Sequence, residues 1–142
     1  MRLTADKIKR ILHQKVAKPK SILRFEITKI KGAKMENVTF EEFKKLDLRI
    51  ARILEVQDHP NADKLYVLKI ALGGETRQLV AGIRLFYKKE DLAGKDIVVI
   101  TNLEPRTIRG IESRGMLLAA QDESGIHILI PEKPTKPGSP VS

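Results

Sequence analysis

The sequence contains no cysteine and no tryptophan. Without cysteine, the chain forms no disulfide, has no thiol nucleophile and cannot bind zinc through thiolates. No apolar run approaches the ~18 residues that a membrane-spanning helix needs. The first residues, MRLTADKIKRILHQ, lack the apolar stretch of a secretory signal. We therefore expect a cytoplasmic protein with no membrane partner.

Motifs for catalysis and for metal binding are scarce as well. His13, His59 and His127 are not spaced with one another, or with carboxylates, as metal ligands are. Ser113 and Ser124 lie in no nucleophile elbow, and no glycine-rich stretch leads into the Gly-Lys-Ser/Thr of a phosphate loop. The sequence therefore predicts no catalytic residue, no metal and no cofactor.

Aromatic side chains make up only 4% of the chain. Proteins that bind single-stranded nucleic acids without sequence preference stack the bases on several rings of one sheet face. Most of the rings here fall at core-like positions, in expected helices or near the N-terminus. Reading the shape and backbone of a folded RNA needs cations and hydrogen-bond donors more than rings. Among nucleic acids, the composition therefore favours a folded RNA.

The positive charge is concentrated in the first quarter of the chain. Residues 1–34 hold eleven Lys and Arg and two acidic residues, so their net charge of +9 equals that of the whole chain. Residues 35–142 are consequently neutral. We treat 1–34 as a basic N-terminal extension of a single domain at 35–142. The extension is either a solvated solubilising arm or an electrostatic arm for nucleic acid.

Periodicity and capping signals predict three elements before the strands of the main body. Apolar residues recur at helical spacing from Ile8 to Val16, which predicts a helix over about 4–17. Apolar and polar residues alternate over 22–30, as is typical of a half-buried strand. Further on, Thr39 and Glu42 fit a capping box, and Val38 with Phe43 fits a hydrophobic staple. These signals predict a short helix over 40–45 that docks on the main body.

The main body has the pattern of a β protein. Residues 86–93 have the composition of a short helix, which falls between the third and fourth of the expected strands. This order predicts an OB-fold, a small five-stranded barrel with short helices, preceded by the basic helix–strand extension. The Pro-rich C-terminal tail, taken alone, has the composition of a disordered segment. The expected strands, separated by turn residues, are 47–57, 64–72, 76–82, 96–102, 115–121 and 125–130.

Four ordered motifs resemble one known family. They are HPNADKL at 59–65, RQLVAGI at 77–83, NLEP at 102–105 and GIESRGMLLAA at 110–120. Together they resemble the tRNA-binding domain that occurs at the C-terminus of methionyl-tRNA synthetases, in phenylalanyl-tRNA synthetase beta chains, in cytokine-like synthetase cofactors and as a free-standing synthetase beta subunit. The resemblance runs from about 38 to 142. The segment FYKKEDL and the ending PGSPV are most similar to the methionyl beta-subunit type.

The resemblance implies an OB-fold, a homodimer and structure-specific binding to the outer corner of the L-shaped tRNA, without enzyme activity. It also implies a partly ordered C-terminal tail, against the tail's composition. The residues that fit a tRNA-binding role are Asn61, Lys64, Arg106, Arg109, Ser113, Arg114 and Met116.

Each of these residues has a chemical rationale and an alternative role. Asn61 and Lys64 offer an amide and a cation to phosphate, but they also suit a turn and a solvated surface. Ser113 offers a hydroxyl, and Met116 offers a flexible apolar surface for ribose or base. Met116 is otherwise a core strand residue. The three arginines provide phosphate contacts or simply a solvated face.

Our leading hypothesis is a non-catalytic tRNA-binding subunit or domain that raises the tRNA affinity of a methionyl-tRNA synthetase catalytic subunit. One alternative is a free-standing, chaperone-like tRNA-binding dimer. Another is a structural dimerisation module of a synthetase. Residues 1–34 have no counterpart in the resemblance. They are an appended RNA-binding arm, a docking segment for a catalytic subunit, or the product of a start codon upstream of Met35.

If residues 1–34 are an RNA-binding arm, a variant that starts at Met35 should bind tRNA more weakly. Its log–log salt slope should fall by about 2–4 units, because each lost phosphate contact removes roughly 0.7–0.9. The loss should be similar for unrelated RNAs, since a cationic arm reads charge rather than shape. Titrations at several salt concentrations measure both quantities. The same affinity and the same slope would show that the arm does not serve RNA binding.

Overall fold

The computed structural model describes residues 35–142. The chain divides into two compact units, Met1–Thr39 and Phe40–Ser142, and the elements described below belong to the second. The helix expected over 4–17 and the strand expected over 22–30 lie outside the described residues. Among residues 35–142, neither helix has the length or the apolar character needed to cross a membrane.

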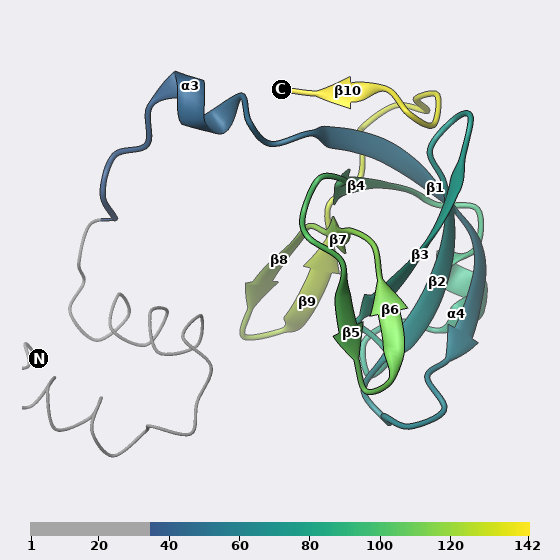
Figure 1. The fold of residues 1–142 in the computed structure, drawn as a ribbon. Coiled ribbons are helices and arrows are strands. Elements are labelled where there is room, and N and C mark those ends of the chain that lie inside the picture. The colour runs from purple at the N-terminus through teal and green to yellow at the C-terminus, as the bar shows by residue number, and fades with distance from the viewer. Residues whose placement is uncertain (1–34) are drawn as a thin grey trace, which may run out of the picture. The chain divides into compact units, whose positions relative to one another are not determined.

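One curled antiparallel sheet forms the barrel, with its strands in the order β3–β2–β1–β4–β7 (Figure 1). A further strand, β10, pairs with the start of β1. The mainly β, OB-like barrel predicted from the sequence is therefore confirmed. The bounds of these strands are Leu48–Asp58 for β1, Tyr66–Ala71 for β2, Thr76–Ala81 for β3, Asp96–Ile100 for β4, Met116–Leu117 for β7 and Pro140–Val141 for β10.

Strand β1 is long enough to serve two partners. Its first part, from Leu48 to Arg52, pairs with β4, and its second part, from Arg52 to Asp58, pairs with β2. The register to β2 shifts between Ile53 and Glu55. Such an irregularity bends a strand and increases its twist. The bend allows the sheet to curl around its own inner face.

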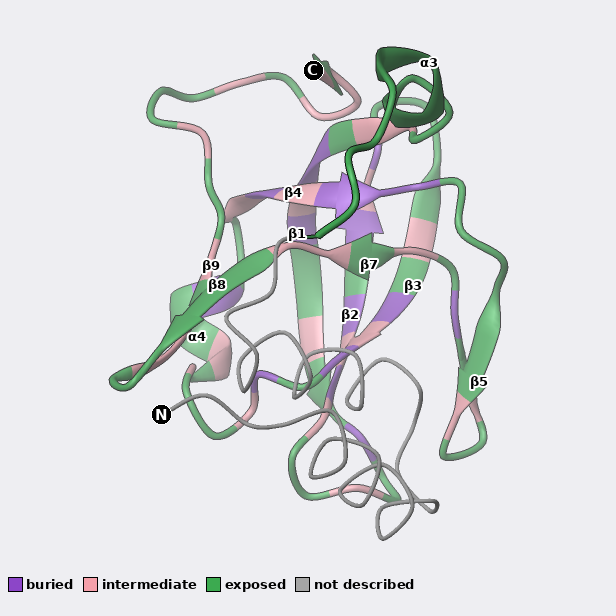
Figure 2. Ribbon diagram, turned by 90° about the vertical axis from the view of Figure 1, so that its left-hand side faces the viewer, coloured by how far each residue is buried: buried purple, intermediate pink, exposed green. Residues whose placement is uncertain are grey.

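The core fills the inside of this curl. In β2, Tyr66, Leu68 and Ile70 are buried, and the residues between them are half-buried or exposed. Figure 2 shows the same pattern as buried segments along the central strands. Burying a side chain of this size contributes ~1.5–3 kcal/mol. The largest fully buried side chains are Ile53, Leu68, Ile70, Leu79, Leu92, Ile97 and Val99.

Two hairpins extend from the barrel. The first joins β5, Arg106–Ile108, to β6, Ile111–Ser113, and the second joins β8, Ala119–Asp122, to β9, Gly125–Ile128. The sequence did not predict the first hairpin, because strands of three residues are too short to show alternation. The single strand expected over 115–121 is divided into β7 and β8. Leu118 interrupts it, and its N–H donates to the carbonyl of Val98.

Both helices are shorter than the sequence predicted. Helix α3 spans Phe40–Phe43 and helix α4 spans Lys89–Leu92. The residues just before α4 form a turn instead of helix, because tertiary hydrogen bonds hold Tyr87. The Tyr66 hydroxyl donates to the Tyr87 carbonyl, and the Tyr87 hydroxyl accepts from a backbone N–H of β9.

The expected docking of the first helix is wrong for the single chain. No residue of α3 is buried, and Phe40 is 68% exposed. The rings of Phe40 and Phe43 stack on each other, 6.4 Å apart, with Lys44 over the Phe40 ring. The capping box of Thr39 and Glu42 stays a prediction.

The barrel closes between β3 and residues 112–115. No strand ladder joins these segments. Instead, the Arg114 N–H donates to the Gln78 carbonyl at 2.9 Å, and the Gln78 side chain donates to the Glu112 carbonyl at 2.9 Å. The Val80 N–H donates to the hydroxyl of Ser113 at 3.0 Å. One backbone bond and two side-chain bonds therefore complete the closure in place of a strand ladder.

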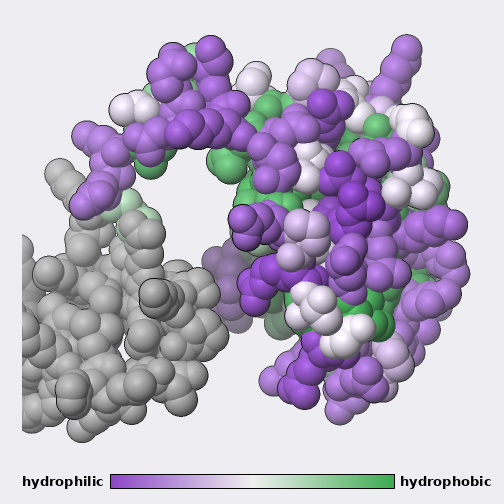
Figure 3. Space-filling model, in the orientation of Figure 1, coloured by the Kyte–Doolittle hydropathy of each residue, from purple (hydrophilic) through white to green (hydrophobic). Residues whose placement is uncertain are grey.

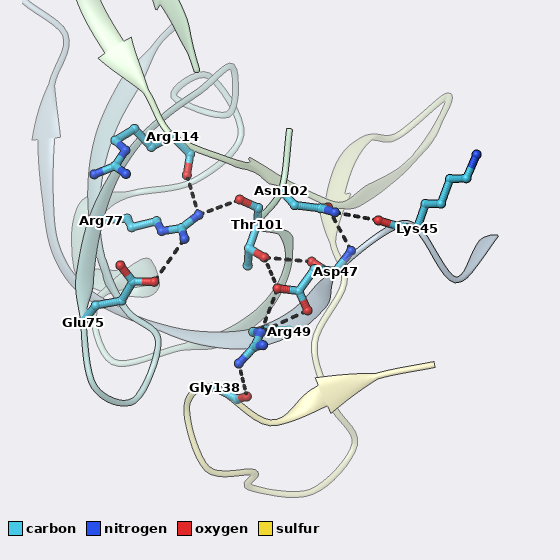
Figure 4. A network of polar contacts seen from close by, with 9 residues as sticks. All are labelled: Lys45, Asp47, Arg49, Glu75, Arg77, Thr101, Asn102, Arg114 and Gly138. Atoms are coloured by element: carbon cyan, nitrogen blue, oxygen red, sulfur yellow. Dashed lines mark hydrogen bonds and ion pairs between the residues drawn. The ribbon is translucent and has the colours of Figure 1, made fainter. Parts of the chain in front are cut away.

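A polar network holds the start of β1 against β4 and the C-terminal tail (Figure 4). The Thr101 hydroxyl donates to the Asp47 carboxylate at 2.5 Å, and Arg49 donates to the same carboxylate at 3.0 Å. Arg49 also donates to the Gly138 carbonyl at 3.5 Å, and the Gly138 N–H donates to the carbonyl of Ile50 at 2.6 Å. The tail is therefore ordered, as the family resemblance implies and its composition does not.

The hydrogen bond from Thr101, supported by Arg49, holds the pKa of Asp47 below its ordinary value. A lowered folded-state pKa stabilises the fold above the ordinary Asp pKa of about 3.9, and this stabilisation is lost as the pH falls through the folded value. We expect Asp47→Asn to be less stable than the native chain at pH 7. The difference should shrink between about pH 4 and pH 2. Urea unfolding of both proteins at about pH 4 and pH 2 measures the difference in their free energy of unfolding. The same difference at both pH values would contradict the role of the Asp47 charge.

Candidate nucleic-acid interface

The turn between β1 and β2 is joined to the tip of hairpin β5–β6. His59 is 3% exposed, and its Nε2 lies 2.9 Å from the carbonyl oxygen of Ile108. Its Nδ1 accepts from the Asn61 N–H at 3.0 Å, so the imidazole proton is on Nε2 and points at Ile108. The Asn61 side-chain amide donates to the carbonyl of Arg109 at 3.2 Å. Asn61 therefore has a structural contact in addition to the RNA contact expected of it.

The three predicted arginines lie in separate places. Arg109 is exposed at the hairpin tip and has a left-handed backbone, with φ 53°. Arg106 is exposed at the base of the hairpin, opposite Ser113 in the register. Arg114 follows β6 and lies 3.8 Å from the carboxylate of Glu112, an exposed pair of little energetic weight. The arginines are thus spread along the hairpin and beyond it, not gathered into one cluster.

A groove of about 480 Å³ brings three of the predicted residues together. Arg106, Ser113 and Met116 line it, with Leu103 and Pro105 among its apolar walls. Met116 is 48% exposed, so the alternative that it is a core residue is wrong. Figure 3 shows that the barrel face seen in the orientation of Figure 1 is mainly hydrophilic, with apolar residues visible between the polar ones. The groove combines apolar walls with a cation at its edge.

Ser113 differs from the other predicted residues because it is only 5% exposed. Its hydroxyl accepts from the Val80 N–H and donates to the Gly115 carbonyl at 3.1 Å. A phosphate oxygen needs a hydrogen-bond donor, and this hydroxyl already donates within the barrel. The geometry gives Ser113 a role in holding the backbone of the groove. A direct contact with RNA stays a prediction.

Lys64 and Arg114 lie apart from this groove. Lys64 is exposed in the turn that precedes β2. Arg114 lines a second groove of about 480 Å³ on the outer side of β2 and β3, together with Lys69, Arg77 and Glu55. Arg77 donates to the carbonyls of Thr101 and Arg114, at 2.6 and 3.5 Å. The local pattern gave no signal for this role of Arg77, because its partners lie 24 and 37 residues away in the sequence.

The structure also brings together Asp122, Ser124 and His127 at the tip of hairpin β8–β9. The Ser124 hydroxyl lies 2.6 Å from Asp122 Oδ1 and 2.8 Å from His127 Nε2. The hydrogen bond from Ser124 is the main cause that lowers the pKa of Asp122. Asp122 contacts the same histidine nitrogen as Ser124, at 3.3 Å. A Ser-His-Asp relay needs the carboxylate on the other nitrogen, so this arrangement is a turn rather than a catalytic triad.

Metal ligation has no support among residues 35–142. They contain no group of three or more His, Cys, Asp or Glu that could hold an ion. Within the described barrel, His59 uses both ring nitrogens in the contacts given above. What the residues offer is a set of exposed cations, an amide and an apolar groove on connected loops. That chemistry suits contacts to phosphate, ribose and base.

Related sequences share this region. The chain is 57% identical over 111 residues to the methionine–tRNA ligase of Thermococcus onnurineus, and 47% identical over 108 residues to that of Methanoculleus marisnigri. These matches cover 78% and 76% of the chain. They cover only 15% and 16% of the ligases, so the chain spans a small part of the length of these relatives.

Solved structures share the fold. A methionyl-tRNA synthetase-related protein from Pyrococcus horikoshii superposes with a TM-score of 0.71 at 29% identity, over 76% of this chain and all of that one. The CsaA chaperone protein of Picrophilus torridus superposes with a TM-score of 0.71 at 32% identity, over 75% of this chain and all of that one.

The match to a protein family covers most of the chain. Residues 48–140 match the family described as "Putative tRNA binding domain". The matched range runs from the start of β1 into β10 and includes the β1–β2 turn, both hairpins and both grooves. The chain therefore belongs to the tRNA-binding domain family.

Proposed function

We propose that the chain is a non-catalytic tRNA-binding module that raises the tRNA affinity of a methionyl-tRNA synthetase in the cytoplasm. The observation that carries this proposal is the extent of the family match, because residues 48–140 include every residue predicted to bind tRNA. The identity of 57% to a methionine–tRNA ligase supports a synthetase as the partner.

The geometry suits recognition of a folded RNA by its backbone. Lys64, Arg106, Arg109 and Arg114 are exposed cations that can meet phosphates. The exposed side chain of Met116 offers an apolar surface to ribose or base in the groove beside Arg106. No aromatic ring lines that groove. Stacking of successive bases is therefore not its mode of binding, and contacts to the shape of the RNA carry the affinity.

A homodimer is part of the same proposal. Helix α3 presents Phe40 and Phe43 on its surface, and α3 has no buried residue. Exposed aromatic side chains are typical of surfaces that bury themselves against another chain. A second copy of this chain would cover the stacked rings symmetrically.

One other function has specific support. CsaA chaperone proteins from Picrophilus torridus and Bacillus anthracis superpose with TM-scores of 0.71 and 0.69 over their whole length. This similarity favours a free-standing, chaperone-like tRNA-binding dimer that works without a synthetase. The alternative of a purely structural dimerisation module has no comparable observation in its favour.

Affinity capture from the native cytoplasm, scored for both a synthetase and tRNA, distinguishes these functions. Recovery of a methionyl-tRNA synthetase together with tRNA is the result we expect. Recovery of tRNA alone would favour the chaperone-like dimer, and recovery of a synthetase without tRNA would favour the structural module.

The dimer is tested separately by light scattering, in which the purified chain should give about twice the mass of one copy. A monomer at micromolar concentration would contradict the dimer.

The site itself is tested by Lys64→Ala and Met116→Ala. Lys64→Ala should weaken tRNA binding by ~1–2 kcal/mol, the scale of a hydrogen bond to a charged group. Met116→Ala should also weaken tRNA binding, by ~1 kcal/mol, because it removes the apolar contact of Met116 with ribose or base. Because Met116 is half exposed, its replacement should cost far less stability than the ~2–5 kcal/mol of a buried methionine.

The matched control is Lys133→Ala, which removes an exposed lysine from the C-terminal tail. Titration with tRNA and thermal unfolding are measured for all three variants. We expect unchanged melting temperatures throughout and unchanged affinity for the control. If Met116→Ala lowers the stability but keeps the tRNA affinity, Met116 has a structural role and does not contact RNA. If Lys64→Ala and Lys133→Ala lost the same tRNA affinity, the contribution of Lys64 would be that of any positive charge on the surface, and Lys64 would not belong to a specific site.

A further inference from the structure

The tip of hairpin β5–β6 is held from outside by two hydrogen bonds. His59 donates to the carbonyl of Ile108, and Asn61 donates to the carbonyl of the next residue, Arg109. We call these two contacts the tip clamp. Both donors belong to the β1–β2 turn, which lies more than forty residues away in the sequence. The clamp therefore joins two loops that each carry residues of the proposed tRNA site.

The tip that is held has an uncommon backbone. Arg109 and Gly110 both have a positive φ, 53° and 88°. Two such residues in succession form the tight connection that matches the twist of a hairpin. Glycine adopts this conformation freely, but a residue with a Cβ does so only rarely. Arg109 is thus held in a backbone conformation that is unfavourable for a residue with a Cβ. The clamp bonds the carbonyl before this residue, that of Ile108, and the carbonyl of Arg109 itself.

Little else fixes the hairpin tip. Strands β5 and β6 form three residue pairs, and no residue of β5 is buried. A short two-stranded hairpin is marginally stable in water without further packing. Ser113 and the carbonyl of Glu112 anchor β6 to β3, but neither bond reaches the tip at Arg109. The position of Arg109 consequently depends on the clamp.

We propose that His59 is a positioning residue for RNA binding, acting through the Ile108 carbonyl to place the guanidinium of Arg109 where it meets a phosphate. This inference rests on the proposed tRNA-binding function. His59 is buried and does not itself touch RNA. Asn61 assists from the exposed side of the turn.

Two substitutions of His59 separate its two hydrogen bonds. The Nδ1 bond to the Asn61 N–H spans two residues, the pattern that an asparagine side-chain oxygen forms in an Asx turn. His59→Asn keeps this turn bond, but its shorter side chain does not reach Ile108. His59→Gln has an amide nitrogen near the position of Nε2, so it keeps the bond to Ile108 and loses the turn bond. The matched control is His127→Gln, which makes the same change on exposed hairpin β8–β9.

We expect His59→Asn to bind tRNA about three- to tenfold more weakly, the effect of one hydrogen bond. Its log–log salt slope should fall by roughly 0.7–0.9, since one phosphate contact is lost. His59→Gln should stay within about twofold of the native affinity, and the affinity of His127→Gln should be unchanged.

In a double-mutant cycle, Arg109→Ala should add little to the loss of affinity in His59→Asn, because the two substitutions act on the same contact. A merely structural histidine would produce none of this coupling.

The contrary outcomes are distinct. Full affinity of His59→Asn, or additive losses with Arg109→Ala, would overturn the positioning role. Equal losses in His59→Asn and His59→Gln would show that the bond to Ile108 has no special weight, and a loss in His59→Gln alone would assign the effect to the turn. Both results would also overturn the positioning role. If His59→Asn does not fold, the exposed variant Asn61→Ala replaces it in the cycle with Arg109→Ala, and additive losses again overturn the clamp. A native chain without tRNA affinity would overturn the proposed function itself, a result separate from failure of the clamp alone.

Discussion

Strand β1 is the element on which the other parts of the barrel depend. It pairs with β4 and β10 along its first part and with β2 along its second. The irregularity between Ile53 and Glu55 bends it, which lets one strand belong to both sides of the curled sheet. Ile53 is also bonded through its N–H and carbonyl to Lys95 and Gly94, and this fixes the segment between α4 and β4. A straight strand would leave the sheet open and the core exposed to water.

The two ends of β1 have different tasks. At its start, Asp47 and Arg49 connect β1 to Thr101 and to the C-terminal tail, so this end of the barrel is closed by polar contacts. At its other end, the chain turns through His59 and Asn61 and meets hairpin β5–β6. The proposed tRNA-binding residues therefore begin where the pairing of β1 ends. Asn61 and Lys64 lie at this end, whereas Met116 pairs with Ile100, which itself pairs with Leu48 at the start of β1.

Three polar side chains hold the backbone of the proposed binding surface without lying openly on it. His59 holds Ile108, Ser113 holds Val80 and Gly115, and Arg77 holds the carbonyl of Arg114. His59 and Ser113 are buried. A buried polar group that lost its partner would destabilise the fold, so these bonds also fix the loops to which they are attached. Two of these bonds hold the backbone beside Arg109 and at Arg114.

The sequence by itself determined the class of fold, the order of strands and helix along the chain, and the family. Alternation in β2 and β3 reports which side chains are inside, because the pleat has a period of two residues. The same reasoning could not find hairpin β5–β6, since strands of three residues carry no measurable period. Nor could it distinguish an exposed Met116 from a core one, because β7 is too short to define its faces.

The arrangement of the candidate site was decided by the tertiary structure. In the sequence, Ser113 had the character of an RNA contact, and His59 was only a histidine without the spacing of a metal ligand. Hydrogen bonds across 33 residues for Ser113 and across 49 for His59 make both of them supports of the site. Local patterns extend over a few residues and cannot report such partners. A sequence therefore specifies which groups are available for binding, and long-range hydrogen bonding and burial specify which of them remain exposed to meet RNA.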